Sequence, residues 1–441
     1  SGKSESSLNS LIARVNYTFL KRYNATTTLR ADNSSRFAAH HRWGYFPSLG
    51  LSWNIDREPF LQGKLSWLDN LKLRVSGGMV GNQEISDYNF STSYSTGSYN
   101  GTSSYAKSTN VNDNLKWETT ASYNIGLDAG LFDERLNIVL DAYYKKTSDL
   151  LLNVPAGFSS GVTTQLQNVG NVVNRGIELT LDGTLIKHRN ISWTANATFA
   201  TNHNEITSMG TASDIILGDA NQQILRKGES LGSFYGLQFA GIVQKGADVS
   251  KLPTINGKTP SAGDAIFVDT NHDHKIDVND RVVLGSIQPA FTYGFGSQLK
   301  WNRFDASIAF SGSYGNKLYN ALGRRLEQTG DSYNVLTTIL NAWTPENASN
   351  TLALPSTTRP FSYIDSRYVQ SASYLKLRNL TIGYQLPLPK DFHAKIRIAL
   401  TGSNLLTFSP YKGFDPEVAS GTDNGAYPAS RNLVLSANIT F

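Results

Sequence analysis

The final segment of the chain, residues 430–441, places apolar side chains at every second position and mostly polar ones between them. The apolar positions are Leu433, Leu435, Ala437, Ile439 and Phe441. This alternation predicts a β-strand with one apolar face. In a soluble sheet, an edge strand with such a face would promote aggregation. In a membrane barrel, lipid covers the apolar face and the wet interior receives the polar one, so the segment favours a transmembrane β-barrel.

The composition excludes other classes of protein. Mean hydropathy is -0.31, and no apolar run approaches the roughly 18 residues that a membrane-spanning helix needs. The aromatic fraction of 11% and the 37 glycines favour β-structure with turn-rich loops. The net charge of +5 is scattered, without the basic stripe that nucleic acid requires, so no nucleic-acid partner is expected. Residues 1–10 lack the features of a signal peptide, so we expect any export signal to lie outside this chain or to have been removed.

Alternating segments recur along the chain in pairs, with short turns inside each pair and long polar connections between pairs. The pairs are 13–19 with 23–31, 49–55 with 71–79, 121–129 with 136–144, 177–185 with 191–199, 291–299 with 304–312, and 380–386 with 396–402. Short turns at one end and long loops at the other are typical of an outer-membrane barrel, with periplasmic turns and extracellular loops. The sequence therefore predicts an all-β fold, an antiparallel transmembrane β-barrel. A soluble β-sandwich is the alternative, although sandwiches rarely carry such loops at one end only.

Several local patterns add detail. Trp67, Trp193, Trp301, Phe304 and Tyr23 lie at or near the short turns, where an aromatic girdle would meet the membrane interface. A short strand is expected at 88–94, and short helices are expected where apolar residues recur in the loop 313–372. The apolar positions in that loop are Leu318, Leu322, Leu326, Val335, Ile339 and Leu340. The polar faces of the first hairpin, carried by Asn16, Thr18, Asn24, Thr26 and Thr28, are interpreted as lining of the barrel interior.

Several stretches resemble the SusC/RagA family of TonB-dependent outer-membrane transporters of Bacteroidota. They are 42–48 (RWGYFPS), 168–181 (NVGNVVNRGIELTL), 269–285, 341–347 (NAWTPEN), 373–384 (SYLKLRNLTIGY) and 411–417 (YKGFDPE). They occur in the order that the family has. The resemblance implies a barrel of about 22 strands with a plug inside it, energy supplied through TonB, and a SusD-like surface lipoprotein as partner. It also implies a location in the outer membrane of a Gram-negative cell of the Bacteroidota type.

The strand count indicates that residues 1–441 form only the C-terminal part of such a barrel. The six pairs and the terminal strand give about 13 strands, whereas a bacterial single-chain barrel needs an even number because its first and last strands pair antiparallel. No plug domain and no TonB box are found in the sequence. We therefore expect the N-terminal strands and plug to belong to another portion of the same transporter, through which TonB would act. If the chain ends in the periplasm, residues 1–10 are expected at the extracellular face.

One acidic loop has the spacing of a calcium site. The side-chain oxygens belong to Asp269, Asn271, Asp273, Asp277 and Asp280, and the backbone carbonyl belongs to Lys275. Side-chain oxygens at positions 1, 3, 5, 9 and 12, with a carbonyl at 7, can surround a hard cation such as Ca²⁺. His274 stands where glycine usually makes the sharp turn, and Asp280 is shorter than the usual glutamate. A structural Ca²⁺ and a metal-free turn-forming loop both remain open.

The predicted function is active import of oligosaccharides or oligopeptides across the outer membrane. Aromatic faces stack on sugar rings, and loop amides bond hydroxyls or peptide backbone. On this ground the candidate substrate-binding residues are Tyr94, Tyr99, Tyr105, Trp117, Tyr314 and Tyr319. A passive porin or a surface adhesin on the same barrel is the alternative. No acid, base or nucleophile set converges in the sequence, so catalytic residues are expected to be absent and the chain is not expected to be an enzyme.

Overall fold

The structure is a computed structural model that describes residues 4–210, 214–218, 222–327, 334–355, 364–389 and 393–441. The chain divides into two compact units. The first unit comprises Ser1–Ile215, Arg226–Glu229 and Phe295–Asn302, and the second comprises Ile216–Leu225, Ser230–Gly294 and Arg303–Phe441. Among the described residues, no helix combines the length and the apolar character needed to cross a membrane.

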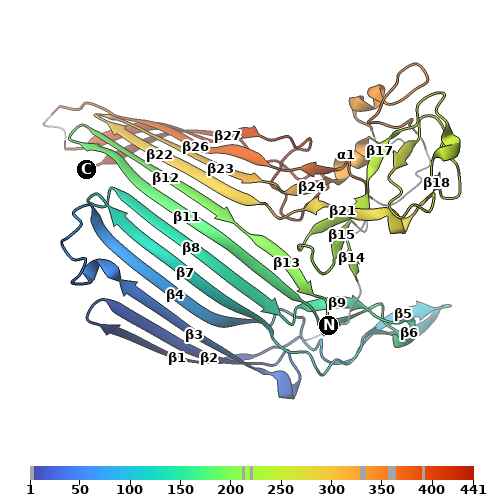
Figure 1. Ribbon diagram of the computed structural model, residues 1–441, viewed down its shortest axis with the longest axis horizontal. Helices are drawn as coiled ribbons and strands as arrows, with labels where there is room; N and C mark the ends of the chain where they lie inside the picture. The colour runs from blue at the N-terminus through green and yellow to red at the C-terminus, as the bar shows by residue number, and fades with distance from the viewer. Residues whose placement is uncertain (1–3, 211–213, 219–221, 328–333, 356–363, 390–392) are drawn as a thin grey trace. The chain divides into compact units, whose positions relative to one another are not determined.

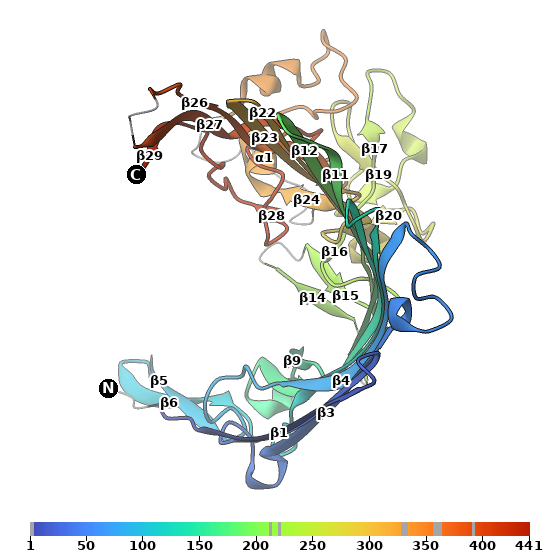
Figure 2. The same cartoon turned by 90° about the vertical axis from the view of Figure 1, so that its left-hand side faces the viewer.

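The first unit is built on an antiparallel sheet in which each strand pairs with the next (Figure 1). Its strands are β1 (Leu8–Phe19), β2 (Tyr23–Ser34), β3 (Trp43–Asn54), β4 (Leu68–Asn82), β7 (Glu118–Leu131), β8 (Leu136–Ser148), β11 (Asn171–His188) and β12 (Ile191–Thr201). The predicted pairs in this part of the chain are all present. The observed strands reach or extend beyond the predicted bounds, except that β3 ends at Asn54, one residue before the predicted end, where a 3-10 turn begins. Figure 2 shows that this sheet is curved rather than flat, as the wall of a barrel must be.

The apolar face of this sheet has aromatic residues towards both ends of its strands. On β3, Trp43 and Tyr45 are exposed near one end and stack at 6.3 Å between ring centroids. Near the other end, Trp53 pairs in register with Tyr23 of β2, and their rings also stack at 6.3 Å. The eight residue steps from Tyr45 to Trp53 span roughly 26 Å of strand. That length suits the apolar band of an outer-membrane barrel, with an aromatic girdle at each interface.

Several turns at one end of the first unit are tight, although residues 55–67 form a longer connection between β3 and β4 at that end. Leu20 and Lys21 adopt left-handed backbone angles between β1 and β2, and Phe132, Asp133 and Glu134 do so between β7 and β8. The opposite end carries longer segments with strands of their own. These are the hairpins β5 (Ser93–Tyr99) with β6 (Thr102–Thr109) and β9 (Leu151–Pro155) with β10 (Thr164–Asn168), and β13 (His203–Ser208), which pairs with β11.

The sequence pattern predicts a short strand at 88–94, but the observed strand lies further along the chain, at Ser93–Tyr99. Residue Tyr88 has a φ of 63° and lies in a turn, and the strand begins only at Ser93. A left-handed residue cannot continue a β-strand, because its backbone leaves the extended region. The hairpin therefore forms further along the chain than the alternation of residues suggests.

The second unit has its own four long strands: β23 (Phe304–Tyr314), β26 (Tyr374–Gln385), β27 (Lys395–Phe408) and β29 (Asn432–Thr440). They pair antiparallel in that order (Figure 1). The residues of β22 (Phe291–Trp301) are divided between the two units. The terminal strand predicted from the apolar alternation is present as β29, and its partner is β27.

The long segments near the wall of the second unit fold into small sheets. Their strands are β14 (Ile215–Leu217), β15 (Gln223–Leu225), β16 (Ser233–Leu237), β17 (Phe239–Ile242), β18 (Thr254–Ile255), β19 (Ala265–Phe267), β20 (Lys275–Ile276), β21 (Arg281–Ser286), β24 (Lys317–Asn320), β25 (Val369–Ser371) and β28 (Thr422–Asp423). One apolar cluster joins Phe234, Tyr319, Ile364, Tyr368 and Val369. These segments therefore have buried cores of their own and are not simple tethers.

The helices are few and short. The helix α1 is Ala321–Leu326, and the 3-10 turns are Ala39–His41, Ile55–Arg57, Phe158–Ser160, Val249–Lys251, Val278–Asp280 and Thr337–Asn341. Of the helical patterns expected in the loop 313–372, Leu322 and Leu326 lie in α1, but Leu318 lies in β24. The Asn320 side chain accepts a hydrogen bond from the Gly323 N–H at 2.7 Å. This cap starts the helix after Leu318 and excludes that residue from it.

Candidate functional site

The polar face of the first unit is connected by hydrogen bonds across its first three strands. Thr18 Oγ1 donates to Asn24 Oδ1 at 2.9 Å, and Asn24 Nδ2 donates to Ser52 Oγ at 3.2 Å. Thr26 Oγ1 donates to Asn16 Oδ1 at 2.9 Å. In a closed barrel this face lines the interior. The side chains predicted as lining thus share one face, and several of them satisfy each other across strands.

Further along the same sheet, an ion cluster joins three strands. Arg74 of β4 contacts Asp128 of β7 at 2.7 Å and Asp141 of β8 at 3.0 Å. Gly126 makes room for this cluster, because a Cβ atom there would overlap the Arg74 guanidinium and the Asp141 carboxylate. The Arg74 guanidinium is thus held by two carboxylates, and the cluster keeps a net negative charge.

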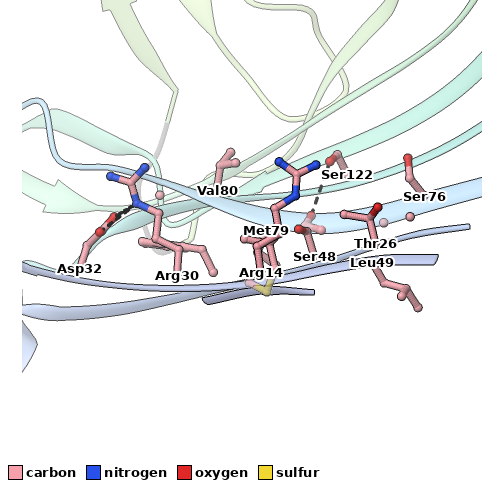
Figure 3. A pocket seen from close by; sticks show the side chains of 16 residues that line it. Arg14, Thr26, Arg30, Asp32, Ser48, Leu49, Ser76, Met79, Val80 and Ser122 are labelled. Atoms are coloured by element: carbon pink, nitrogen blue, oxygen red, sulfur yellow. Dashed lines mark hydrogen bonds and ion pairs between the residues drawn. The ribbon is translucent and has the colours of Figure 1, made fainter. Parts of the chain in front are cut away.

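A hollow of about 580 Å³ lies on the polar side of β1 to β4 and β7. Arg14 and Arg30 point into it from β1 and β2, and Asp32 lies beside Arg30 (Figure 3). Its other lining residues are small ones and apolar ones: Ser48, Gly50, Ser76, Gly78 and Ser122, and Phe46, Met79 and Val80. These residues were not predicted as a site from the sequence. The alternation of apolar and polar residues could have indicated part of this site, because it places Arg14 and Arg30 on the polar face of their strands.

The six aromatic residues predicted to bind substrate do not form one site. Trp117 is 6% exposed within the cluster of Phe37, Phe46, Ile85 and Leu115, and its indole N–H donates to the Arg42 carbonyl at 3.0 Å. The Trp117 indole therefore belongs to a hydrophobic core at the end of the first unit that carries the long loops.

Tyr319 is similarly enclosed. It is 3% exposed in β24, and its hydroxyl accepts a hydrogen bond from Arg324 at 3.0 Å. Tyr314 is exposed and stacks on Phe291 at 5.1 Å. Of the six, Tyr314 and the three tyrosines of the β5–β6 hairpin keep an exposed ring.

The β5–β6 hairpin presents Tyr94, Tyr99 and Tyr105, all exposed. The register pairs Thr96 with Tyr105 and Tyr94 with Lys107. Because residues two apart share a face of a strand, Tyr94 and Tyr105 lie on one face and Tyr99 lies on the other. A role of these rings in substrate binding stays a prediction.

In the acidic loop 269–280, the side chains hydrogen-bond to the backbone of the same loop. The carboxylates of Asp269, Asp273, Asp277 and Asp280 accept hydrogen bonds from loop N–H groups at 2.7 to 3.3 Å. His274 has a φ of 61°, the left-handed angle that glycine normally adopts at this position. Asn271 accepts a bond from the Asp273 N–H at 3.1 Å. Lys275 belongs to β20, which runs parallel to β18.

Among the described residues, no group of three or more His, Cys, Asp or Glu side chains is arranged to hold a metal ion. Binding of Ca²⁺ therefore stays a prediction for the loop positions Asp269, Asn271, Asp273, Lys275, Asp277 and Asp280.

Calcium should slow proteolysis of residues 264–283 in the whole transporter relative to chelator. Asp269→Ala together with Asp273→Ala should abolish this protection without unfolding the barrel, since the ion would lose two of its side-chain oxygens. The exposed Asp113→Ala variant is the control. Equal proteolysis rates of the wild type in calcium and in chelator would exclude a site in this loop.

A buried charge network in the second unit attaches the segment 409–431 to β26. Lys376 has a side chain only 4% exposed, and its ammonium contacts Asp415 at 2.7 Å and Glu417 at 2.6 Å. Arg378 holds the same Glu417 carboxylate with both terminal nitrogens, and the Tyr374 hydroxyl donates to it at 2.6 Å. The carboxylates therefore have charged or hydroxyl donors that replace water.

These donors change the acidity of the two loop carboxyls. Burial alone would raise the pKa of Glu417, but hydrogen bonds from Arg378, Lys376 and Tyr374 outweigh it and lower that pKa to about 2. The pKa of Asp415 is also lowered, because the bond from Lys376 and backbone N–H groups outweigh burial. A carboxyl with a depressed folded-state pKa stabilises the fold fully above its unfolded pKa and less as pH falls.

Amide hydrogen exchange in residues 409–431, after correction of the rates for intrinsic exchange, should therefore quicken as the pH falls from about 4.5 towards about 2. In Glu417→Gln this acid-dependent part should shrink, because the titrating group is gone. The corrected exchange of the β5–β6 hairpin serves as the internal control. Identical acid dependence of the segment in wild type and Glu417→Gln would contradict the assignment.

Comparison with known proteins identifies the fold. A family model described as TonB dependent receptor-like, beta-barrel, matches residues 1–405. The chain belongs to this family. TonB-dependent receptor P3 of Formosa agariphila is 34% identical over 99% of the chain, and TonB-dependent receptor SusC of Bacteroides thetaiotaomicron is 31% identical over 98%. These matches cover 46% and 44% of the relatives, so the chain spans about half the length of the curated relatives it matches.

Solved structures agree with this assignment. The RagAB peptide transporter superposes with a TM-score of 0.83 at 29% identity, covering 99% of this chain and 48% of that one. The resemblance to the SusC/RagA family is thus confirmed. In this TonB-dependent receptor barrel, the stretches 373–384 and 411–417 that carry part of the resemblance contribute Lys376, Arg378, Asp415 and Glu417 to one network. The sequence alone showed these stretches as motifs and did not show that they meet.

Proposed function

We propose that this chain is part of an active importer of oligosaccharides or oligopeptides in the outer membrane of a Gram-negative cell of the Bacteroidota type. The observation that carries the proposal is the superposition on the RagAB peptide transporter over nearly the whole chain. The SusC relative supports the same assignment. The aromatic girdles of the first unit suit a wall in contact with outer-membrane lipid, and its polar face suits passage of a hydrophilic cargo.

The cargo class has support from one relative. RagAB is named as a peptide transporter and importer, which favours oligopeptides, whereas the names of the Formosa relatives and of SusC specify no cargo. The hydroxyl- and amide-rich polar face can hydrogen-bond either the backbone of a peptide or the hydroxyls of a glycan. We therefore propose both cargo classes and assign no catalytic residue.

Uptake by living cells tests this function. A strain lacking the transporter and the same strain with the wild-type gene restored are supplied with labelled peptide pools and labelled glycan pools. Import predicts that one pool enters only the restored cells. An adhesin would change attachment of cells to a surface and leave uptake of both pools equal in the two strains.

The whole transporter is further proposed to include an N-terminal barrel and plug portion that contacts TonB, and a SusD-like surface lipoprotein. Gentle extraction of the intact complex from outer membranes should therefore yield a second extracellular subunit, because the described parts of segment 313–372 form strands and a helix and are too large to act only as connections. Mass spectrometry of the extract identifies the subunits. An unrelated porin extracted in parallel is the control, and absence of a transporter-specific second subunit would contradict the partner assignment.

A further inference from the structure

The connection between β3 and β4, residues 55–67, folds back onto the apolar side of the sheet. The buried Glu58 carboxylate accepts hydrogen bonds from the Tyr23 hydroxyl and, at 2.9 Å, from the Trp53 indole N–H. Both rings belong to the apolar face, because the two residues pair in register and the alternation of each strand places them there. Arg22 neutralises the carboxylate at 2.7 Å. The connection is therefore held on the side of the wall that faces lipid.

Two more contacts fix the start of the connection. Asp56 Oδ1 accepts a hydrogen bond from the Leu71 N–H of β4 at 3.2 Å, and Arg57 Nη1 donates to the Lys21 carbonyl at 3.1 Å. Figure 2 shows the connection, drawn in blue, on the convex side of the sheet. A plug belongs on the concave side, and further strands would continue the sheet beyond β1, which β2 separates from β3. This surface therefore faces lipid in the whole transporter as well.

The charges that the connection presents to its surroundings are positive. The Arg57 side chain is 57% exposed, whereas Asp56, 3.8 Å away, is only 19% exposed. Glu58 is enclosed by its three donors, and Lys64 is exposed. The acids are thus bonded within the fold and the cations reach outward. Cations beside a membrane are attracted to anionic lipid headgroups.

Exposed aromatic rings accompany these cations. Phe60 is 57% exposed. Trp67 is exposed and lies 6.4 Å from Phe132 of the next tight turn, measured between ring centroids. The rings extend the aromatic girdle at this end of the strands. A segment that combines aromatic and cationic side chains lies in the plane of the membrane interface, with its rings among the acyl chains and its cations at the headgroups.

We propose that residues 55–67 bind anionic phospholipid headgroups of the periplasmic leaflet. Arg57 and Lys64 contact the phosphate groups, and Phe60 and Trp67 contact the adjoining acyl chains. A guanidinium presents paired N–H donors that match phosphate oxygens, and an ammonium binds phosphate as a point charge. The inference rests on the proposed location in the outer membrane and is independent of which cargo is imported.

A fluorophore on the connection tests this assignment in the whole transporter. Gln62→Cys gives an exposed attachment site, and this chain has no other cysteine. Transporter without the substitution measures any labelling elsewhere. The labelled protein is placed in phosphatidylcholine bilayers that contain a minor fraction of either brominated phosphatidylglycerol or brominated phosphatidylcholine. Bromine on the acyl chains quenches a nearby fluorophore, so the quenching reports which lipid adjoins the connection.

The proposal predicts that both brominated lipids quench the label at position 62 and that phosphatidylglycerol does so at lower mole fractions. A label on Ser103→Cys, in the exposed β5–β6 hairpin at the opposite end of the strands, should be quenched by neither lipid. This second label separates a position at the membrane from one in water.

Arg57→Gln together with Lys64→Gln should lower the relative affinity for phosphatidylglycerol about tenfold or more, because each cation adds to the attraction. Quenching by phosphatidylcholine should persist, which verifies that the variant still places the connection at the membrane. Arg57→Lys keeps the charge and should retain most of the preference. Lys245→Gln together with Lys258→Gln removes the same charge from exposed positions of the second unit and should leave the preference unchanged.

Equal quenching of the wild type by the two brominated lipids would overturn the headgroup assignment. Absence of quenching by either lipid would place the connection in water and overturn the whole proposal, as would equal effects of the two double variants. Cellular uptake is measured separately to test import. Loss of uptake of both labelled pools would contradict the import function and leave the lipid preference, which needs no cargo, as a distinct result.

Discussion

Replacing Lys376 with alanine is expected to destabilise the attachment of segment 409–431 by about 3–5 kcal/mol, the usual effect of removing one partner of a buried ion pair. The ammonium of Lys376 lies between Asp415 at 2.7 Å and Glu417 at 2.6 Å. Its removal leaves Asp415 without a cation and leaves Glu417 with Arg378 and Tyr374. Because these carboxylates are partly withdrawn from water, solvent cannot restore the whole of the lost interaction.

Hydrogen exchange resolved by segment measures this effect. Exchange in residues 409–431 should rise by two orders of magnitude or more, as a loss of about 3 kcal/mol implies. The exposed Lys412→Ala, in the same segment, is the matched control and should change exchange little. If Lys376→Ala and Lys412→Ala exchange alike, the network does not hold this segment to β26.

Replacing Trp117 with alanine is expected to lower the free energy of unfolding by about 3–5 kcal/mol, as for large aromatic residues in other cores. Its ring centroid lies 5.3 Å from that of Phe37 and 5.4 Å from that of Phe46. Truncation leaves a cavity and frees the Arg42 carbonyl that accepts the indole N–H. Both losses act on stability, so the largest effect of this change should not be on cargo binding.

Thermal unfolding and cargo binding are compared for Trp117→Ala and for Tyr99→Ala. Tyr99 is 80% exposed at the tip of the β5–β6 hairpin, so its removal should change stability by less than about 0.5 kcal/mol. A normal unfolding midpoint in Trp117→Ala, combined with lost cargo binding, would show that this tryptophan contacts cargo after all.

The wall of the fold could be predicted from the sequence because a strand with one face in lipid needs strict alternation. The terminal strand illustrates this: Leu433, Leu435 and Ile439 fix its face before any partner is known. The ends of strands were less predictable. At Tyr88, the backbone turns into the left-handed region, and nothing in the residue type requires this.

The site was less predictable than the wall, since it depends on contacts between distant residues. An exposed and a buried aromatic look the same in a sequence, so Trp117 and Tyr99 could not be separated until the loop end had folded around Phe37. Lys376 and Glu417 meet across 41 positions of the chain, a separation that residue spacing cannot indicate.

The most direct test of the account is whether import depends on energy from the inner membrane. Uptake of the labelled cargo is measured in cells that carry the wild-type transporter, before and after a protonophore collapses the proton gradient, with surface binding subtracted at low temperature. Active import through a TonB-dependent receptor barrel predicts that accumulation stops when the gradient is lost and that surface binding persists. Uptake that continues at an unchanged rate would contradict this account and would show that the chain forms part of a passive pore.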